Sequence, residues 1–283
     1  MRRILGGVLF RRWGGFVVAV ALVGLPHAAF AQQVSVPASF HRQERALSCE
    51  VATLKMALKV HGIEVSESEL IARLPFDVTP RGNGIWGDPN VGFVGRIDGR
   101  MLHDGYGVYW DPIAALGERY AAASVMRHGS PQQLARAITA GNGVIIWGYY
   151  GKRAVYNWQT PAGNVVHAMN GQHTRLVYGF DGSVEAPTRF YLIDPLSGPL
   201  SWSTEELMHN WSSFQHMGVI VAARSRWVRV PGDVAVWEID DKNNTRRWVM
   251  TWRTFVSRGG SAAAVADIDN QELLKYYVGA PIY

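Results

Sequence analysis

The hydrophobic pattern of this chain changes its period near Gly143, and this change limits the possible folds more than any other feature of the sequence. Before Gly143, apolar residues recur at helical spacing, as in the segment "CEVATLKMALK" that begins at Cys49. After it, short runs of β-branched and aromatic residues alternate with turn sequences such as "FDGS" and "DPLSG". The pattern predicts an α+β fold, in which a helical N-terminal half packs against an antiparallel sheet.

Three helices are predicted in the N-terminal half. Each begins just after a serine that can serve as its N-cap and ends before a glycine or a proline: Ser48 to Gly62, Ser66 to Pro75 and Ser130 to Gly141. Residues 81–109 are rich in glycine and lack periodicity, so a long surface loop is predicted there. A G-x-G-x-x-G pattern inside this loop has no strand before it and no helix after it, which argues against a nucleotide site.

Four strands are predicted after the change of period, at residues 143–150, 173–180, 189–194 and 217–224. Beyond Arg224, the segments "VAVWEID" and "RRWVMTWRTF" flank the polar "DKNNT", which is a hairpin signal. The predicted organisation is a papain-like α+β domain over residues 32–224, followed by a small Trp-rich β module over residues 225–283.

The first 31 residues have the parts of a secretory signal: four arginines, the apolar run Phe16–Leu25, and the sequence Ala-Phe-Ala that ends at Ala31. The apolar run is about half of the roughly 20 residues that a membrane span needs. Removing the signal removes four arginines and lowers the formal charge from +5 to +1, which argues against a nucleic-acid partner. The mature chain is expected outside the cytoplasm, in the periplasm, at the cell surface or secreted, with no stable membrane span.

Cys49 is the only cysteine of the 283 residues. Exported proteins usually pair their cysteines in disulfides, so a single one is a buried core residue, a link to another chain or a reactive thiol. Free cysteines are commonly buried. A thiol at a helix N-terminus, however, lies at the positive end of the helix dipole, which stabilises the nucleophilic thiolate.

A catalytic cysteine needs a histidine as proton partner and a carboxylate or amide that orients the histidine. His173 opens one predicted strand and Asp194 ends the next, so antiparallel pairing would bring the two to neighbouring strand ends. His167 is the reserve candidate. Gln43 lies six residues before Cys49, and its amide N–H groups can help to bind an oxyanion, although an exposed polar loop residue is the simpler interpretation.

The ordered set Gln43, Cys49, His173 and Asp194 carries a family resemblance. In the segments "ALSCEVATLKMAL", "GQHTRLVYGFDG" and "YLIDPLSG" it resembles papain-like cysteine peptidases, most closely the bacterial double-glycine (bacteriocin-processing) peptidase-like family. The segments "GIWGDPNVGFVG" and "DGYGVYWDPI" look like the exported, stand-alone branch of that family. The resemblance covers roughly Val36 to Ala223.

The resemblance implies a role for each of these residues. Cys49 would be the nucleophile, His173 the general base and later acid, and Asp194 the group that holds the histidine ring. Gln43 would contribute to the oxyanion hole. A glycine often follows the cysteine in the leader peptidases, whereas Glu50 does here and places a negative charge beside the thiol.

The sequence therefore predicts an exported cysteine hydrolase, a peptidase or amidase that acts on a peptide or peptide-like substrate. No metal or organic cofactor is expected, because the histidines lack H-E-x-x-H or C-x-x-C spacing. The alternatives are a catalytically silent secreted binding module and a protein linked covalently to a partner through Cys49. Trp237, Trp248 and Trp252 are candidates for binding a cell-surface polymer or protein, although such residues often form the core of a small module.

Overall fold

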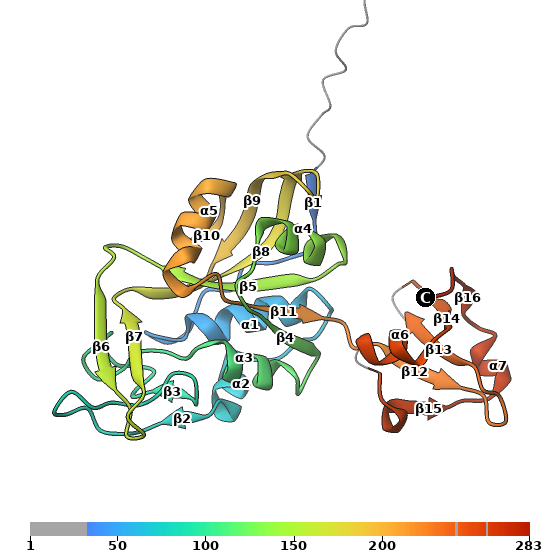
Figure 1. Cartoon of the computed structure of the whole chain (residues 1–283), viewed down its shortest axis with the longest axis horizontal. Coiled ribbons are helices and arrows are strands. Elements are labelled where there is room, and N and C mark those ends of the chain that lie inside the picture. The colour runs from blue at the N-terminus through green and yellow to red at the C-terminus, as the bar shows by residue number, and fades with distance from the viewer. Residues whose placement is uncertain (1–32, 241–242, 259) are drawn as a thin grey trace, which may run out of the picture. The chain divides into compact units, whose positions relative to one another are not determined.

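The structure is a computed structural model of the whole chain, and it describes residues 33–240, 243–258 and 260–283 (Figure 1). The signal peptide predicted over residues 1–31 lies outside the described residues. Within these ranges, every helix is too short or too polar to cross a membrane.

A seven-stranded antiparallel sheet organises the residues before Ala223. Its hydrogen-bonded order is β10-β9-β8-β5-β11-β4, and β1 pairs with β8. The strands are β1 (Gln33–Ser35), β4 (Ala122–Met126), β5 (Gly143–Tyr149), β8 (Gln172–Gly182), β9 (Pro187–Asp194), β10 (Gly198–Ser203) and β11 (Gly218–Ala222). The predicted α+β class with an antiparallel sheet is confirmed.

Five helices accompany this sheet, together with one 3-10 turn. They are α1 (Cys49–Lys59), α2 (Glu67–Arg73), α3 (Trp110–Gly117), α4 (Pro131–Thr139), α5 (Thr204–Trp211) and the turn η1 (Ser212–Phe214). Helices α1, α2 and α4 are the three that the sequence predicts. In Figure 1, α1 and α5 lie on opposite sides of the central strand β5. This cover explains why β5 is a continuous apolar run, with Val144, Ile145, Ile146 and Trp147 at most 1% exposed.

The N-terminal half contains strands, and one helix, α3, that the sequence analysis does not predict. Strand β4 and the short strands β2 (Phe76–Asp77) and β3 (Phe93–Val94) lie in it. The sequence of β4, "AASVM", has neither alternation nor turn signals, and its conformation depends on pairing with β11, about a hundred residues further along the chain. A hairpin of β6 (Val155–Gln159) and β7 (Val165–Met169) was also not predicted, and it joins β5 to β8.

Two predicted N-caps have different outcomes. Ser130 forms the complete capping box with Gln133 at the start of α4, as predicted. Ser48 occupies the N-cap position of α1 but makes no side-chain cap bond. Its hydroxyl is used elsewhere, because Oγ donates to Oε1 of Glu67 at 2.5 Å.

The C-terminal residues form a second sheet with the order β15-β12-β13-β14-β16. Its elements are β12 (Arg226–Arg229), β13 (Val236–Asp240), β14 (Thr245–Val249), β15 (Val265–Asp267), β16 (Tyr277–Val278), α6 (Trp252–Ser257), α7 (Asn270–Leu273) and the 3-10 turn η2 (Ala262–Ala264). The predicted hairpin is present as β13 and β14, but its second strand ends at Val249. Residues 252–255, predicted as part of that strand, lie in α6, where the side chain of Thr251 caps the helix. Trp227 and Phe255 form one small core, while Trp252 is 64% exposed.

Candidate active site

Cys49 is the first residue of α1 and its side chain is buried, at 5% exposure. The hydroxyl of Thr53, one turn further along the helix, meets the hydroxyl of Thr174 on β8 at 3.0 Å. Because Thr174 directly follows His173, this contact fixes the first turns of α1 against the strand that carries the predicted base.

The thiol of Cys49 donates to Oε2 of Glu50 at 3.3 Å. Burial raises the pKa of Cys49 well above its usual value, and the charge of Glu50 raises it further. Hydrogen bonds from Thr174 act in the opposite direction and do not outweigh these two effects. The resting residue is therefore a neutral thiol, and the helix dipole alone does not make it a thiolate.

His173 and Asp194 form a buried pair. Nε2 of His173 lies 3.0 Å from Oδ1 of Asp194, and the two residues are 3% and 1% exposed. The neighbouring strands β8 and β9 bring them together, as predicted from the sequence. Since Nε2 donates to the carboxylate, Nδ1 is the ring nitrogen left to accept a proton.

Arg175 completes this cluster on the same strand as His173. Its Nε lies 2.9 Å from Oδ2 of Asp194, and its guanidinium stacks 4.7 Å from the ring centre of Trp202. Burial alone would raise the pKa of Asp194, but the hydrogen bond from His173 and the charges of His173 and Arg175 hold it well below its usual value. Burial lowers the pKa of His173, and the charge of Arg175 lowers it further, against the opposing effect of Asp194. The imidazole is therefore neutral at pH 7, as a general base must be.

The structure does not join the cysteine directly to this pair. In the described part of the chain, no hydrogen bond links Cys49 to His173, and the sulfur contacts Glu50 and Thr174 instead. Their roles as nucleophile and base stay predictions. The reserve candidate His167 is exposed on β7. Its Nδ1 lies 2.9 Å from Oδ1 of Asn157, so its side-chain hydrogen bond is with that residue and not with Asp194.

Gln43 lies in the segment before α1, and its amide is turned toward that segment's own backbone. Nε2 donates to the carbonyls of Arg45 at 2.8 Å and Ala46 at 3.0 Å, while Oε1 is buried without a partner. Rotating the amide by half a turn would set its oxygen against two carbonyls, so the bonding fixes this orientation. Contribution to an oxyanion hole requires at least one of these bonds to break, and that role stays a prediction.

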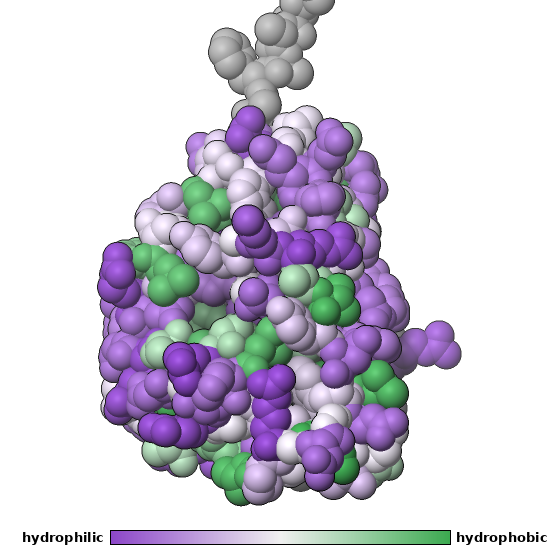
Figure 2. Space-filling model, turned by 90° about the vertical axis from the view of Figure 1, so that its left-hand side faces the viewer, coloured by the Kyte–Doolittle hydropathy of each residue, from purple (hydrophilic) through white to green (hydrophobic). Residues whose placement is uncertain are grey.

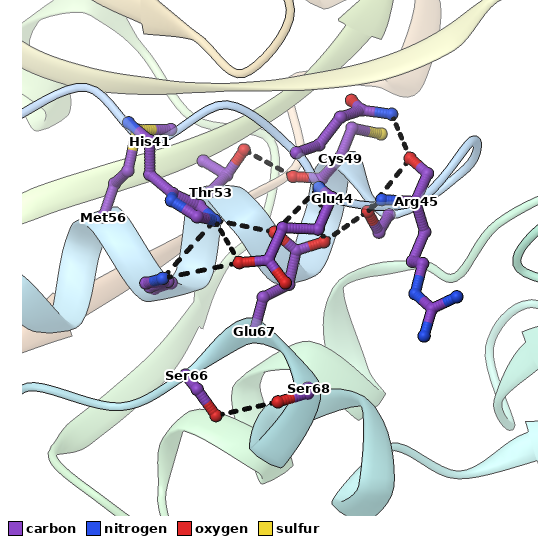
Figure 3. A network of polar contacts seen from close by, with 12 residues as sticks. His41, Glu44, Arg45, Cys49, Thr53, Met56, Ser66, Glu67 and Ser68 are labelled. Atoms are coloured by element: carbon purple, nitrogen blue, oxygen red, sulfur yellow. Dashed lines mark hydrogen bonds and ion pairs between the residues drawn. The ribbon is translucent and has the colours of Figure 1, made fainter.

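Glu67 anchors the segment that leads into Cys49. Figure 3 shows its side chain pointing from α2 toward this segment. The carboxylate is fully buried and accepts from Ser48 Oγ at 2.5 Å, from the Glu44 backbone N–H at 3.1 Å and from His41 Nε2 at 2.8 Å. The sequence analysis predicts a helix that includes Glu67 but gives this residue no role, and nothing in the local pattern points to contacts with residues some twenty positions earlier.

The same network brings together His41, Glu44 and Glu67, whose ligand atoms lie within 4.8 Å of one another. Residue type alone would suit a metal ion. The ammonium of Lys55, however, lies 3.8 Å from the carboxylate of Glu44 and 3.5 Å from Nε2 of His41. The ammonium of Lys55 thus already supplies a positive charge to His41 and Glu44, and we interpret these contacts as a structural network.

A helix that begins at a buried cysteine, packed on an antiparallel sheet with a buried histidine and aspartate at neighbouring strand ends, defines a cysteine-peptidase-like fold. Residues 32–219 match the model of the Peptidase_C39 like family, and the chain belongs to that family. The resemblance drawn from the sequence is thereby confirmed.

Individual proteins are also similar to this chain. The chain is 30% identical over 152 residues to YvpB of Bacillus subtilis (strain 168), a protein described as uncharacterized. The match covers 52% of this chain and 57% of YvpB, so it spans little more than half of that relative. A Bacillus anthracis protein described as a C39-like peptidase has a similar crystal structure, with a TM-score of 0.59 and 25% identity over 68% of this chain and 98% of the other.

A more distant likeness joins the chain to a double glycine motif protease from an AMS/PCAT transporter, solved in complex with the leader peptide. The TM-score is 0.39 and the identity 14%, over 67% of this chain and 95% of the other.

Proposed function

We propose that this protein is an exported cysteine peptidase or amidase that hydrolyses an amide bond by acyl transfer. The observation that carries the proposal is the buried contact of 3.0 Å between His173 and Asp194. The next residue of the strand, Thr174, contacts Thr53 in the helix that begins at Cys49. Membership of the Peptidase_C39 like family supports the same chemistry. Cys49, His173 and Asp194 are its nucleophile, base and orienting carboxylate.

The reaction begins from neutral groups. Nδ1 of His173 takes the proton of the Cys49 thiol while the sulfur bonds to the substrate carbonyl carbon, and the carbonyl oxygen gains the negative charge. The backbone N–H of Cys49, and Gln43 once its amide turns, stabilise that oxygen. The imidazolium then protonates the leaving amine as the C–N bond breaks. Water, activated by His173, hydrolyses the thioester and restores the thiol.

The substrate class is a peptide or peptide-like amide. The β6–β7 hairpin leads directly into the strand of His173 and exposes hydrophobic side chains, among them Val155 at 59% and Val165 at 53%. Figure 2 shows the side of the molecule on which this hairpin lies, with hydrophobic groups as separate patches among hydrophilic ones. A surface of this kind suits an extended peptide with apolar side chains. The signal peptide predicted from the sequence supports a reaction outside the cytoplasm.

Hydrolysis of a mixed fluorogenic peptide library tests the proposal. Wild-type protein freed of residues 1–31 and kept reduced should release fluorophore, and Cys49→Ala and His173→Ala should each reduce the rate by at least about 10³-fold. His209→Ala, which removes an exposed histidine from α5 and lies outside the β6–β7 hairpin, should retain wild-type activity and serves as the matched histidine control. Equal rates for the wild type and Cys49→Ala would rule out Cys49 as the nucleophile.

A second candidate function is binding through the C-terminal sheet, either alongside hydrolysis or in its place. Trp252, Tyr277 and Tyr283 are 64%, 73% and 80% exposed, although buried aromatic residues are available for the core of this sheet. Exposed aromatic rings of this kind suit a cell-surface polymer or protein. Co-sedimentation with purified cell walls should decrease for Trp252→Ala and stay unchanged for Cys49→Ala. No sedimentation of the wild type would exclude the polymer.

A further inference from the structure

Glu50 is a buried carboxylate in direct contact with the reacting sulfur, and the steps described above do not use it. It is fully buried, and Oε2 lies 3.3 Å from Sγ of Cys49. The other oxygen, Oε1, accepts from the backbone N–H of Val108 at 2.9 Å and from Nε2 of Gln172 at 3.0 Å. Glu50 therefore bonds to the nucleophile, to the glycine-rich segment and to the residue that precedes His173.

The packing around Glu50 leaves its carboxylate little freedom. A Cβ atom added to Gly107 would lie 2.6 Å from Oε1 of Glu50 and 2.3 Å from Oε1 of Gln172. Only a glycine permits the backbone to approach this closely. The two hydrogen bonds on Oε1 thus fix the direction of Oε2, which faces the thiol.

Burial raises the pKa of Glu50, while hydrogen bonds from Val108, Gln172 and Cys49 oppose that rise and favour the carboxylate. Within the described residues, Glu50 forms no ion pair. Its charge acts on Cys49 of its own helix and on Tyr106 and Tyr109 in the glycine-rich segment. Arg175 on β8 interacts electrostatically with Cys49. The guanidinium of Arg175 is committed to Asp194. A carboxylate in this setting favours a neighbour that donates a proton over one that carries a second negative charge.

We propose that Glu50 is a positioning residue. It holds the Cys49 thiol protonated and in place until the thiol proton is transferred to His173. This inference rests on the proposed function. At rest, the S–H group donates to Oε2 of Glu50. When the carbonyl carbon arrives, the sulfur exchanges this partner for Nδ1 of His173, and the proton moves from sulfur to Nδ1. Glu50 keeps its own protonation state throughout. The hydrogen bond from Cys49 to Glu50 would protect the thiol in an oxidising compartment, since the thiolate is the form that is oxidised.

The test is the rate of Cys49 alkylation by iodoacetamide as a function of pH, read by intact mass. Glu50→Gln keeps Oε1 and its two hydrogen bonds but replaces Oε2 with an amide donor, which stabilises a thiolate. The alkylation midpoint should lie above the free-thiol value of about 8.5 in the wild type. In Glu50→Gln it should fall by at least one pH unit, which means about tenfold faster alkylation at pH 8. Glu69→Gln, an exposed glutamate of α2, should match the wild type.

Unfolding would also bring the midpoint toward the free-thiol value, so thermal unfolding is recorded at each pH. Glu50→Asp keeps the charge and shortens the side chain by one methylene group, which disturbs packing more than Glu50→Gln does. Its midpoint should nevertheless stay above that of Glu50→Gln. Identical profiles for folded wild type and folded Glu50→Gln would overturn the inference. Alkylation requires no turnover, so a protein that shows the shift but hydrolyses no peptide would contradict the proposed function and leave the contact between Glu50 and Cys49 supported.

Discussion

The guanidinium of Arg175 lies 2.9 Å from Oδ2 of Asp194, on the oxygen that His173 does not use. The carboxylate is therefore held by a cation on one side and by the imidazole on the other. Two further bonds reach Oδ1 from the backbone N–H groups of Leu196 and Ser197, at 2.8 and 3.3 Å. Asp194 cannot rotate without breaking several of these contacts, so it fixes both the tautomer and the plane of the histidine ring.

Replacing Arg175 with methionine should raise the pKa of His173, because the cation that disfavours the imidazolium is gone. The base must be neutral, so the acidic limb of the pH–rate profile should move to higher pH. We also expect kcat/KM at pH 7 to fall about tenfold or more, because the ring is held less firmly. Measuring the pH–rate profile of Arg175→Met against that of Arg189→Met, which removes an exposed arginine from β9, checks this. An unmoved acidic limb would show that Arg175 does not act on His173.

Stability at alkaline pH should depend on Cys49. Its pKa is higher in the folded protein than in the unfolded chain, so above about pH 8.5 the folded protein holds a proton that the unfolded chain has lost. Below about pH 8.5, the contribution of Cys49 to the free energy of unfolding is at its maximum. It decreases as the pH rises, by up to about 1.4 kcal/mol per unit.

Urea unfolding at pH 7.5 and 9.5 measures this effect in the wild type and in Cys49→Ser. The wild type should lose more stability than the serine variant between the two values. The variant also corrects for Tyr106 and Tyr109, whose pKa values are raised in the same direction by burial. A serine variant that loses as much stability as the wild type would contradict a raised pKa at Cys49.

The central helices and strands of this protein were accessible from its sequence, but several elements between them were not. The runs that became β5, β8 and β9 are rich in β-branched and aromatic residues, and local composition alone identifies them. Strand β4 and helix α5 were missed, because the first depends on a distant partner strand and the second is a short helix of mixed polarity directly after β10. The C-terminal hairpin was predicted because a polar turn separates two strongly patterned segments.

The candidate site was accessible only in part. The order of His173 and Asp194 on successive strands was enough to predict their contact, because antiparallel neighbours share their ends. The negative charge of Glu50 beside the thiol was evident from the sequence. Its contacts with Val108 and Gln172, and the partners of Glu67 and Arg175, were not predictable, because they depend on how side chains of different elements are oriented in the complete fold. The amide of Gln43 shows the same limit, since its orientation is decided by two carbonyls of its own segment.

Gly107→Ala should disturb the site from the side of the glycine-rich segment. The added methyl group has no room beside Glu50 and Gln172, and overpacking of this kind costs about 1–3 kcal/mol. Hydrolysis should fall as well, because both displaced groups are neighbours of Cys49 and His173. Gly82→Ala in the same segment meets no atom within 4 Å and should behave like the wild type. Urea unfolding and peptide hydrolysis are measured for both variants in parallel. Equal stability and equal hydrolysis rates for Gly107→Ala and Gly82→Ala would refute the prediction.

Glu67→Gln should loosen the segment that presents Cys49, since the carboxylate accepts hydrogen bonds from Ser48, Glu44 and His41. An amide in its place turns an N–H group toward one of these donors, and an unsatisfied buried donor costs about 1–3 kcal/mol. Glu69→Gln, in the same helix with its side chain 43% exposed, should change the free energy of unfolding by less than about 0.5 kcal/mol. Urea unfolding measures both, and kcat/KM should fall only for Glu67→Gln, because Ser48 precedes the nucleophile. Full activity in a destabilised Glu67→Gln protein would mean that the network supports the fold without positioning the thiol.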